Sequence, residues 1–360
     1  MSLLASSWRS VGRTSASSGA TAKTAPPVYR VADLARYFPV SRGVFRAPKK
    51  WIKAVDGVSF SIPQGTTFGL VGESGCGKTT LARILVGIEK PSSGAVYVNG
   101  KNLFEAGDDF FRAYRSTVQM VFQDPFASLD PRMRVRDIIR EPLDTHSRLS
   151  RRQKHVRVEE VLELVGLRKA VGRLRPHQFS GGERQRIALA RAMALNPRII
   201  ILDEPVSSLD ASVRAQILNL LIDMQEMSGY TYLFISHDLA AVRYVSHTVG
   251  VMYLGKLVEI ADSKTFHAKP LHPYAQALLA SKMTATQHPG EEHALISGEV
   301  PSAIAMPPGC RFHPRCPFAM PVCSAVEPEL RELAEGQSAA CHLYGLGERG
   351  EGEPQTLEPR

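Results

Sequence analysis

Nine consecutive residues in the first quarter of the chain have the types and spacing of a loop that binds phosphate groups. Glycines at positions 72, 75 and 77 allow a tight backbone curl, and the curl points successive N–H groups at one anion. A lysine adds positive charge, and the hydroxyl that follows it can reach Mg²⁺. The loop matches G-x-x-x-x-G-K-[ST] and consists of Gly72, Glu73, Ser74, Gly75, Cys76, Gly77, Lys78, Thr79 and Thr80. We expect these residues to bind the phosphates of a nucleotide, and Thr79 to bind Mg²⁺ as well.

A second candidate group is the acidic pair Asp203 and Glu204, which follows four apolar residues at 199–202. Such an apolar run predicts a buried central strand, and ligands bind at the carboxyl ends of these strands. A carboxylate there can hold Mg²⁺, a hard cation that prefers oxygen ligands. We therefore expect Asp203 to contribute to the metal site. The alternative interpretation is a helix cap or a solvated turn.

Four of the five cysteines lie in the last fifth of the chain, spaced C-x5-C-x6-C-x17-C. The sequence shows no export signal, so we expect a bound metal rather than disulfides. Four thiolates suit Zn²⁺ or a [4Fe–4S] cluster, and the short C-x2-C spacing of common zinc ribbons is absent. Free thiols are the remaining alternative. The candidate ligands are Cys310, Cys316, Cys323 and Cys341.

These candidate residues need a frame that brings them together. Residues 67–71 read as a strand before the phosphate loop, and residues 81–86 as the helix after it. Residues 199–202 and 231–235 read as further buried strands, with a helix at 212–227 between them. Strands that alternate with helices predict an α/β fold with a mainly parallel sheet.

Composition divides the chain into a main domain at 28–262 and several additions. Residues 1–27 lack acidic side chains and resemble a transit peptide, but we expect a disordered tail. The Arg-rich residues 126–176 predict an inserted helical subdomain. The Pro-rich residues 263–345 predict a small extension that carries the four cysteines, and residues 346–360 a second disordered tail.

Charge and hydropathy limit the possible functions but do not identify one. The net charge of +9 and the pI of about 9.4 suit nucleic acid, anionic lipid or phosphorylated ligands. The chain has no interleaved aromatic and basic platform of the kind that single-strand binders use, and we expect no nucleic-acid partner. No window approaches the ~18–20 uninterrupted apolar residues of a membrane span.

Further motifs accompany the phosphate loop in a fixed order along the chain. They are Val121-Phe122-Gln123-Asp124, Phe179-Ser180-Gly181-Gly182-Glu183, Ile199 to Pro205, Ser208-Leu209-Asp210 and Ser236-His237-Asp238. With them, residues 28–262 resemble the ATP-binding-cassette (ABC) ATPases. The resemblance implies a RecA-like, mainly parallel core with an antiparallel β subdomain and a helical subdomain. It also implies that two such domains sandwich two ATP molecules between them.

The resemblance further implies roles for single residues. Glu204 resembles the general base that polarises the attacking water, and His237 the switch histidine that touches the γ-phosphate. Gln123 resembles the residue that reaches Mg²⁺ and water and carries movement to a membrane partner.

Nucleotide contacts from elsewhere in the chain follow from the same resemblance. Ser180, Gly181, Gly182, Glu183 and Asp210 belong to the elements that complete the nucleotide sites, the first three facing the ATP of the partner subunit. Phe179 and Glu183 depart from the commonest pattern, which has Leu and Gln there. An aromatic face is expected for adenine, with Phe38 preferred over its neighbour Tyr37 and core packing as the alternative.

Local stretches resemble one branch of this family, the ATPase subunits of oligopeptide and dipeptide importers. They are Arg36 to Val40, Lys53 to Phe60, Phe122 to Arg132, His272-Pro273-Tyr274, Gly298 to Ser302 and Pro308 to Pro317. The resemblance then covers residues 28–345 and is closest to the second of two paired ATPases. Nickel importers belong to the same wider group, so nickel or another small solute stays open as the cargo.

Membership in that branch would imply particular partners and a cellular location. The implied partners are a homologous ATPase subunit, two transmembrane permease subunits and a peptide-binding protein outside the membrane. The implied location is the cytoplasmic face of the bacterial membrane, as a peripheral protein. The same resemblance favours [4Fe–4S] over Zn²⁺ for the four cysteines.

Two other classes of protein fit less well. A soluble ABC protein acting on DNA or ribosomes would carry a long coiled-coil insertion or a second cassette. Here only about fifty residues separate Gln123 from Ser180, and the phosphate loop occurs once. A binding module with an inactive ATPase would not need Lys78, Glu204 and His237, all of which are intact.

Overall fold

The computed structural model describes residues 27–40, 50–124, 128–283 and 301–345. The tails expected at 1–27 and 346–360 lie outside these residues, apart from Pro27, which begins the first strand. Residues 125–127 and 298–300 of the importer-like stretches also lie outside them.

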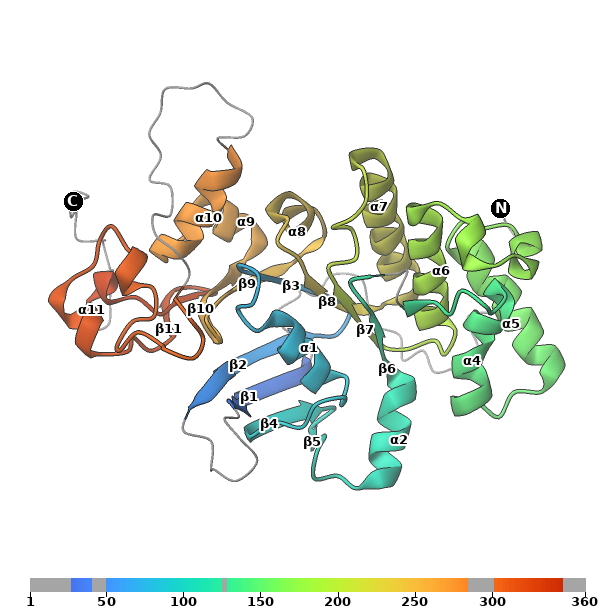
Figure 1. The fold of residues 1–360 in the computed structure, drawn as a ribbon, viewed down its shortest axis with the longest axis horizontal. Coiled ribbons are helices and arrows are strands. Elements are labelled where there is room, and N and C mark those ends of the chain that lie inside the picture. Colours follow the sequence, from blue (N-terminus) through green and yellow to red (C-terminus); the bar gives the residue numbers. More distant parts are fainter. Residues whose placement is uncertain (1–26, 41–49, 125–127, 284–300, 346–360) are drawn as a thin grey trace.

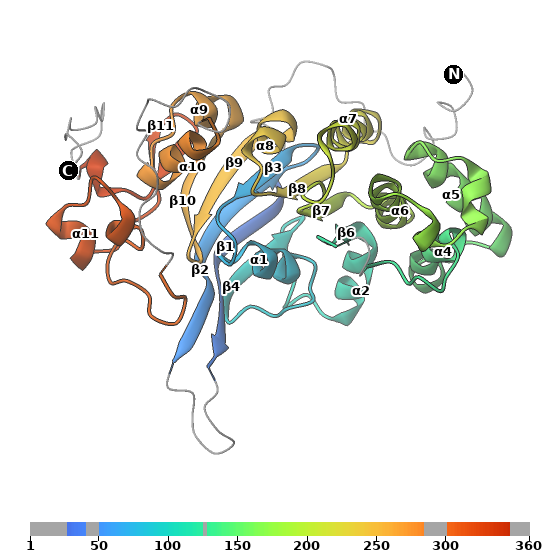
Figure 2. The same cartoon turned by 45° about the horizontal axis from the view of Figure 1, so that its top comes forward.

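The centre of the molecule is an eight-stranded sheet in the order β11-β12-β10-β9-β3-β8-β7-β6. Figure 2 shows β10, β9, β3 and β8 side by side in this sheet. Its five parallel strands are β6 (Val118–Val121), β7 (Ile199–Asp203), β8 (Thr231–Ile235), β3 (Thr67–Val71) and β9 (Thr248–Tyr253). The antiparallel strands β10 (Lys256–Asp262), β12 (Gln337–Ala339) and β11 (Arg331–Ala334) continue the sheet beyond β9. The predicted α/β fold with a mainly parallel core is confirmed.

Apolar residues on both sides of the parallel strands explain why these strands are buried. In β7, Ile199 and Ile201 face one hydrophobic cluster, whereas Ile200 and Leu202 face the other. All four are fully buried. Successive side chains of a strand point to opposite faces, so a continuous apolar run needs a packed layer on each face.

The layer on one face comes from helix α1 (Lys78–Leu85) and a second, antiparallel sheet. That sheet has the order β2 (Trp51–Pro63), β1 (Pro27–Pro39), β4 (Ser93–Val98) and β5 (Lys101–Asn102). Helix α2 (Asp108–Thr117) leads from it to β6 (Figure 1). Because α1 starts at Lys78, this layer sets the direction of the phosphate loop.

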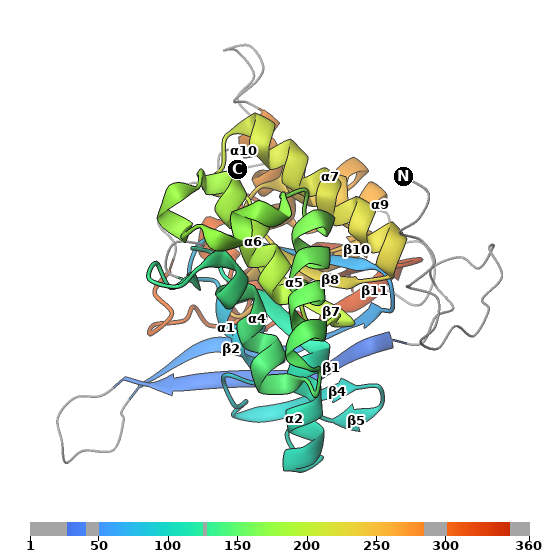
Figure 3. The same cartoon turned by 90° about the vertical axis from the view of Figure 1, so that its right-hand side faces the viewer.

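Helices form the layer on the other face. They are α6 (Gly181–Met193), α7 (Ala211–Ser228) and α8 (Leu239–Val245). Helices α4 (Val135–His146) and α5 (Arg151–Leu164) pack on α6 and form the helical subdomain with two short 3₁₀ turns, Lys169–Arg173 and Pro176–Gln178. Figure 3 shows α4, α5 and α6 together at this end of the molecule.

The C-terminal extension lies at the opposite end from the helical subdomain (Figure 1). It comprises α9 (Ser263–Ala268), α10 (Pro273–Met283), α11 (Pro321–Ala325), the β11–β12 hairpin and 3₁₀ turns at His313–Arg315 and His342–Tyr344. Since β12 hydrogen-bonds to β10, the extension completes the central sheet, which its loose sequence pattern did not predict. The domain limits given above stay predictions. No helix within the described ranges is both long and apolar enough to cross a membrane.

Candidate nucleotide-binding and catalytic site

The phosphate loop connects the carboxyl end of β3 to the start of α1, as its sequence pattern predicts. Two positions require glycine for steric reasons. A Cβ atom at Gly72 would lie 2.2 Å from the carbonyl oxygen of Met252, and one at Gly77 would lie 2.0 Å from that of Ala54. Gly77 has a φ of +112°, which side chains disfavour as well. The loop is therefore pressed against β2 and β9, and this packing fixes its curl.

Lys78 carries the positive charge of the loop. Its side chain is only 6% exposed, and its Nζ donates to the carbonyl oxygens of Gly72 (2.7 Å) and Glu73 (2.9 Å). A buried ammonium held by neutral carbonyls is well placed to exchange one of them for a phosphate oxygen, which makes a stronger, charge-assisted bond.

The loop lines a cleft of about 180 Å³. Residues from 74 to 80 form its floor, and Ile52, Lys53 and Ala54 of β2 form one side. Gln123 and Glu204 complete the polar side, and Ala303 and Met306 of the extension also line the cleft. The structure thus brings together the phosphate loop, the glutamine and the candidate base, and adds a wall that sequence reasoning did not predict.

Asp203 and Thr79 make the candidate magnesium site. Asp203 ends β7 and is 2% exposed, and its Oδ1 accepts a hydrogen bond from Thr79 Oγ1 at 3.5 Å. Burial, with the nearby charge of Glu204, raises the pKa of Asp203 above its ordinary value. A divalent cation would offset both effects, because it favours the ionised carboxylate. A hydroxyl and one carboxylate next to a phosphate loop fit the way Mg²⁺ binds with nucleotides.

Glu204 is the meeting point of the catalytic candidates. Its Oε2 accepts a hydrogen bond from Gln123 Nε2 at 3.1 Å and lies 3.2 Å from Nδ1 of His237. The backbone of Glu204 has a φ of +48°, an unfavourable conformation for a residue with a side chain. Its N–H donates to Ile235 O at 2.9 Å, which holds this turn at the edge of the sheet. Two residues from separate chain segments, Gln123 and His237, therefore converge on the carboxylate of Glu204.

The second phosphate-facing element forms the start of α6. Ser180 is its N-cap, and Ser180 and Glu183 cap each other reciprocally, with Ser180 N–H donating to Glu183 Oε2 at 3.0 Å. This capping explains why the helix begins at Gly181, and why glutamate replaces glutamine without disturbing the turn. A Cβ atom at Gly182 would lie 2.3 Å from Cγ1 of Val213, so the glycine allows α6 to pack against α7.

Asp210 caps α7 through its side chain, which accepts from Val213 N–H at 2.9 Å. Ser180 and Asp210 are both exposed. Neither they nor Gly181, Gly182 and Glu183 line the cleft beside the phosphate loop. The nucleotide contacts of these five residues stay a prediction.

The two candidate adenine-stacking residues have different surroundings. Tyr37 donates a short hydrogen bond to Asp56, whose carboxylate also pairs with Arg311. Burial and the hydrogen bond to Asp56 raise the pKa of Tyr37 to about 12. Phe38 lies opposite Ile52, which lines the cleft, and the guanidinium of Arg36 covers its ring at 4.6 Å. Neither aromatic ring lines the cleft itself, so the adenine contact of Phe38 stays a prediction.

From the sequence alone, the neighbouring Lys78 and the helix N-terminus predict a lowered pKa for Cys76, and the structure shows that this prediction is wrong. The thiol is 4% exposed, and burial raises its pKa more than the nearby Lys78 lowers it. Cys76 fills space below the loop, with its sulfur 2.8 Å from where a Cβ atom of Gly72 would lie. It is a packing residue with a protonated thiol at neutral pH.

Arg311 of the extension binds the main domain close to the phosphate loop, a role that the sequence did not predict. Arg311 is 8% exposed and donates both to Asp56 and to Leu254 O. Asp56 N–H in turn donates to Gly255 O at 2.9 Å, and Gly255 N–H donates to Cys76 O at 2.8 Å. The only sequence signal for this network was the importer-like stretch Pro308 to Pro317.

The four C-terminal cysteines form no disulfides. Burial raises the pKa of Cys316 to about 11 and that of Cys341 to about 12; Cys310 and Cys323 add to both shifts, and Cys316 adds to that of Cys341. The four thiols thus lie within electrostatic range of one another. Across the described residues, however, no three His, Cys, Asp or Glu side chains are placed to hold a single metal ion.

Comparison with known proteins agrees with this geometry. Residues 55–207 match the model of the ABC transporter family, and residues 258–323 match that of the oligopeptide/dipeptide transporter C-terminal region. The chain is 47% identical over 328 residues to the oligopeptide transport ATP-binding protein AppF of Bacillus subtilis, covering 90% of this chain and 99% of that protein. The chain belongs to the ATP-binding subunits of oligopeptide and dipeptide ABC transporters.

A second relative in this family is the di/tripeptide transport ATP-binding protein DppF of Pseudomonas aeruginosa. It is 46% identical over 310 residues, covering 86% of this chain and 95% of the relative. Among solved structures, an ATP-binding cassette in a dimeric, post-hydrolysis state bound to ADP and Pi matches with a TM-score of 0.58 and 26% identity. The match covers 65% of this chain and 98% of the chain in that structure. As an ABC transporter ATPase, the chain hydrolyses ATP.

Proposed function

We propose that this ABC ATPase powers the uptake of dipeptides or oligopeptides through two permease subunits, working as one of a pair of unequal cassettes. The observation that carries the proposal is the combination of a complete hydrolytic cleft with a peptide-transporter extension built into the same sheet. It would act at the cytoplasmic face of a bacterial membrane, with a peptide-binding protein on the far side. Nickel or another small solute is the second candidate cargo.

The geometry supports specific roles in hydrolysis. Glu204 accepts a proton from the attacking water, and Gln123 and His237 hold that carboxylate and orient the water. Lys78 and the loop N–H groups bind the β- and γ-phosphates. Mg²⁺, held by Asp203 and Thr79, would neutralise charge on the phosphates. Gln123 would contact this Mg²⁺ through the side-chain amide that also bonds to Glu204.

The exposed tip of α6 supports a two-cassette arrangement. Ser180 and Gly181 present a helix N-terminus to solvent rather than to their own cleft, and such termini bind anions. In a facing pair, this tip would contact the γ-phosphate held by the partner. ATP would then hold the two subunits together, and its hydrolysis would release them. The partner we propose is a homologous subunit of the same transporter.

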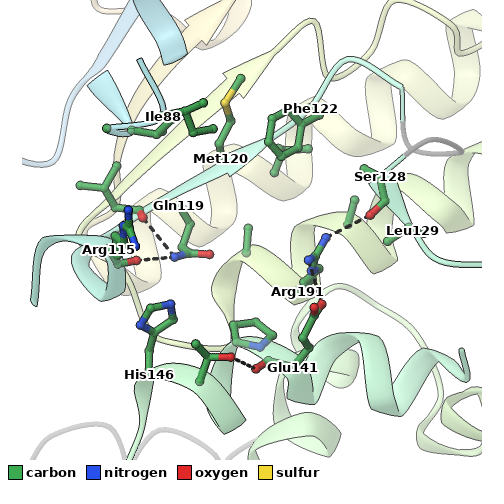
Figure 4. A pocket seen from close by; sticks show the side chains of 18 residues that line it. Ile88, Arg115, Gln119, Met120, Phe122, Ser128, Leu129, Glu141, His146 and Arg191 are labelled. Atoms are coloured by element: carbon green, nitrogen blue, oxygen red, sulfur yellow. Dashed lines mark hydrogen bonds and ion pairs between the residues drawn. The ribbon is translucent and has the colours of Figure 1, made fainter. Parts of the chain in front are cut away.

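A groove beside Gln123 suits the permease. It has a volume of about 440 Å³ and lies between the end of α1, β6 and helices α4 and α6. Figure 4 shows Ile88, Met120 and Phe122 on one side of it, with Glu141 and Arg191 on the other. Ile88 is 60% exposed and Phe122 is 40% exposed. Phe122 adjoins Gln123 in the chain, so an amphipathic permease helix seated here would move with the γ-phosphate sensor.

We expect Ile88→Asp to abolish peptide uptake in cells whose only copy of the gene carries it, because a charge in the groove prevents docking. The purified variant should keep its basal ATPase rate within about twofold, since the cleft is unchanged. Met227→Asp is the matched control, because Met227 is 66% exposed on α7 and lies outside the groove. Normal peptide uptake with Ile88→Asp would refute the docking site. Uptake of nickel but not of labelled peptides by the wild type would assign the second cargo.

A separate proposal concerns Cys310, Cys316, Cys323 and Cys341, which we propose hold a [4Fe–4S] cluster, with Zn²⁺ as the alternative. A single Zn²⁺ bonds each sulfur at about 2.3 Å and would draw the four sulfurs together. In a [4Fe–4S] cluster each thiolate binds a different iron, so the sulfurs stay farther apart. Cys310, Cys316 and Cys323 each add to the raised pKa of Cys341, which supports a shared site for the four thiolates. A bound group would favour the thiolates and fix the short extension.

Anaerobically purified protein should absorb near ~400 nm and contain iron and acid-labile sulfide. Cys316→Ser and Cys341→Ser should each remove most of the iron, whereas Cys76→Ser should keep it, because Cys76 lies below the phosphate loop. Zinc without iron in the elemental analysis would refute the cluster. If the analysis finds neither iron nor zinc, the four thiols are free packing residues and both metal proposals are wrong.

A further inference from the structure

The C-terminal extension reaches the phosphate loop directly at Glu73. Arg315 donates from its two terminal nitrogens to the two carboxylate oxygens of Glu73, at 2.8 and 3.0 Å. Its side chain is 6% exposed, and that of Glu73 is 24% exposed. This two-bond pairing of a guanidinium with a carboxylate fixes orientation as well as charge. The two residues are 242 positions apart in the chain, so only the fold brings them together.

A second contact fixes the backbone of the same residue. The N–H of Glu73 donates to the hydroxyl oxygen of Tyr274 at 2.9 Å. The Tyr274 side chain is fully buried, and its ring lies 4.6 Å from that of Tyr253 and 5.4 Å from that of Phe312. Tyr274 comes from α10 and Arg315 from the 3₁₀ turn beside Cys316, so two parts of the extension hold one loop residue.

The extension is itself firmly anchored at this point. Glu259 of β10 is fully buried and accepts hydrogen bonds from the N–H groups of Leu271 and His272 and from Nε2 of Gln337. Burial lowers the pKa of His272 to about 3, so this histidine is neutral. Its Nδ1 accepts from Tyr274 N–H at 3.1 Å. Tyr274 therefore has little freedom to move away from the loop.

Charge makes the contact with Arg315 important for ATP. Glu73 places a carboxylate in a loop whose ligand carries several negative charges. Left unpaired, that carboxylate would repel the phosphates. It could also turn toward Lys78, whose Nζ is already bonded to Glu73 O at 2.9 Å, and compete for its charge. The Arg315 guanidinium neutralises the carboxylate and holds it on the side of the loop that faces the extension.

We propose that Arg315 is a positioning residue for ATP binding: together with Tyr274 it holds Glu73 away from the phosphates and keeps the loop in its nucleotide-binding shape. The extension then controls the affinity of the ATPase for ATP. This goes beyond the proposed transport role, because the effect belongs to the isolated subunit and does not depend on the cargo.

The test measures binding of a fluorescent ATP analogue, together with ATPase kinetics, on the purified full-length chain. Arg315→Met should raise the Kd and KM for ATP about 10- to 100-fold and change kcat less than about threefold. Adding Glu73→Gln to Arg315→Met should restore most of the affinity, because the unpaired carboxylate is gone. The Kd of Arg315→Lys should lie between those of the wild type and Arg315→Met, since lysine keeps the charge but cannot pair through two bonds.

Lys256→Met is the matched control. It breaks an ion pair of 2.9 Å between β10 and Glu327 of the extension without touching the loop, and should leave the Kd unchanged. An unchanged Kd for Arg315→Met, or a double variant that binds no better than Arg315→Met alone, would overturn the proposal. If Arg315→Met does not fold, Tyr274→Phe decides, because it removes only the acceptor for Glu73 N–H. It should weaken ATP binding severalfold, and unchanged binding would again overturn the proposal.

Discussion

Replacing Glu204 with glutamine should lower the ATP turnover of the purified protein by about 100- to 10,000-fold while ATP still binds. Glutamine has the same shape but cannot take a proton from water. The γ-phosphate should therefore persist, and with it the contact between the two subunits. We expect the variant, mixed with the homologous partner subunit proposed above, to form a stable dimer in the presence of ATP and Mg²⁺, detected by size-exclusion chromatography, and to show no dimer with ADP.

The matched control is Glu89→Gln, which removes a carboxylate that pairs with Arg36 away from the cleft. Its turnover should stay within about twofold of the wild type. Turnover of the Glu204 variant within tenfold of the wild type would show that another group acts as the base. Loss of ATP binding in that variant would instead assign Glu204 a structural role in the turn after β7, in keeping with its φ of +48°.

Replacing Lys78 with methionine should raise the Kd for ATP about 100-fold or more. Methionine fills similar space, so the change removes the charge and its hydrogen bonds rather than the packing. The loss is large because the ammonium is nearly buried and its bonds to phosphate would form away from water. Titration with a fluorescent ATP analogue measures the change, and thermal unfolding separates it from loss of the fold.

Lys53→Met tests whether any lysine in the cleft would have the same effect. Lys53 lines the same cleft, but its side chain is 46% exposed and pairs with Asp56 at 3.4 Å. Solvent screens such a charge, so we expect less than a fivefold change in Kd. An equal rise in Kd for the two variants would contradict the specific role of Lys78, because it would show that ATP affinity depends only on the total charge of the cleft.

Much of the nucleotide site follows from local sequence because its chemistry is local. The curl from Gly72 to Gly77 and the positions of Lys78 and Thr79 depend on a few neighbouring residues and a strand-to-helix change. The apolar run before Asp203 likewise identifies a central strand. A shared magnesium site for Asp203 and Thr79 was expected from their residue types and positions, whereas roles for Glu204, Gln123 and His237 at one site were expected only through the family resemblance. The meeting of these three residues depends on the order of strands in the sheet, which local patterns do not encode.

Cys76 shows how a local argument fails when burial decides. A lysine two residues away and a helix N-terminus argue for a lowered pKa, but the thiol lies under the loop, where the loss of water outweighs both. The degree of burial depends on β2 and β9, which are distant in sequence. The start of α6 shows the reverse case, since the Ser180–Glu183 spacing is a capping signal readable without any structure.

The amino-acid sequence by itself determined the class of fold, the phosphate loop, the acidic strand end and the set of four cysteines, since each is written in contiguous residues. Only the tertiary structure decided that the extension joins the central sheet and that Arg315 and Tyr274 hold Glu73. The physical reason is distance along the chain. Contacts between residues some two hundred positions apart arise from the packing of whole elements, and no local pattern of residue types specifies which side chains then meet.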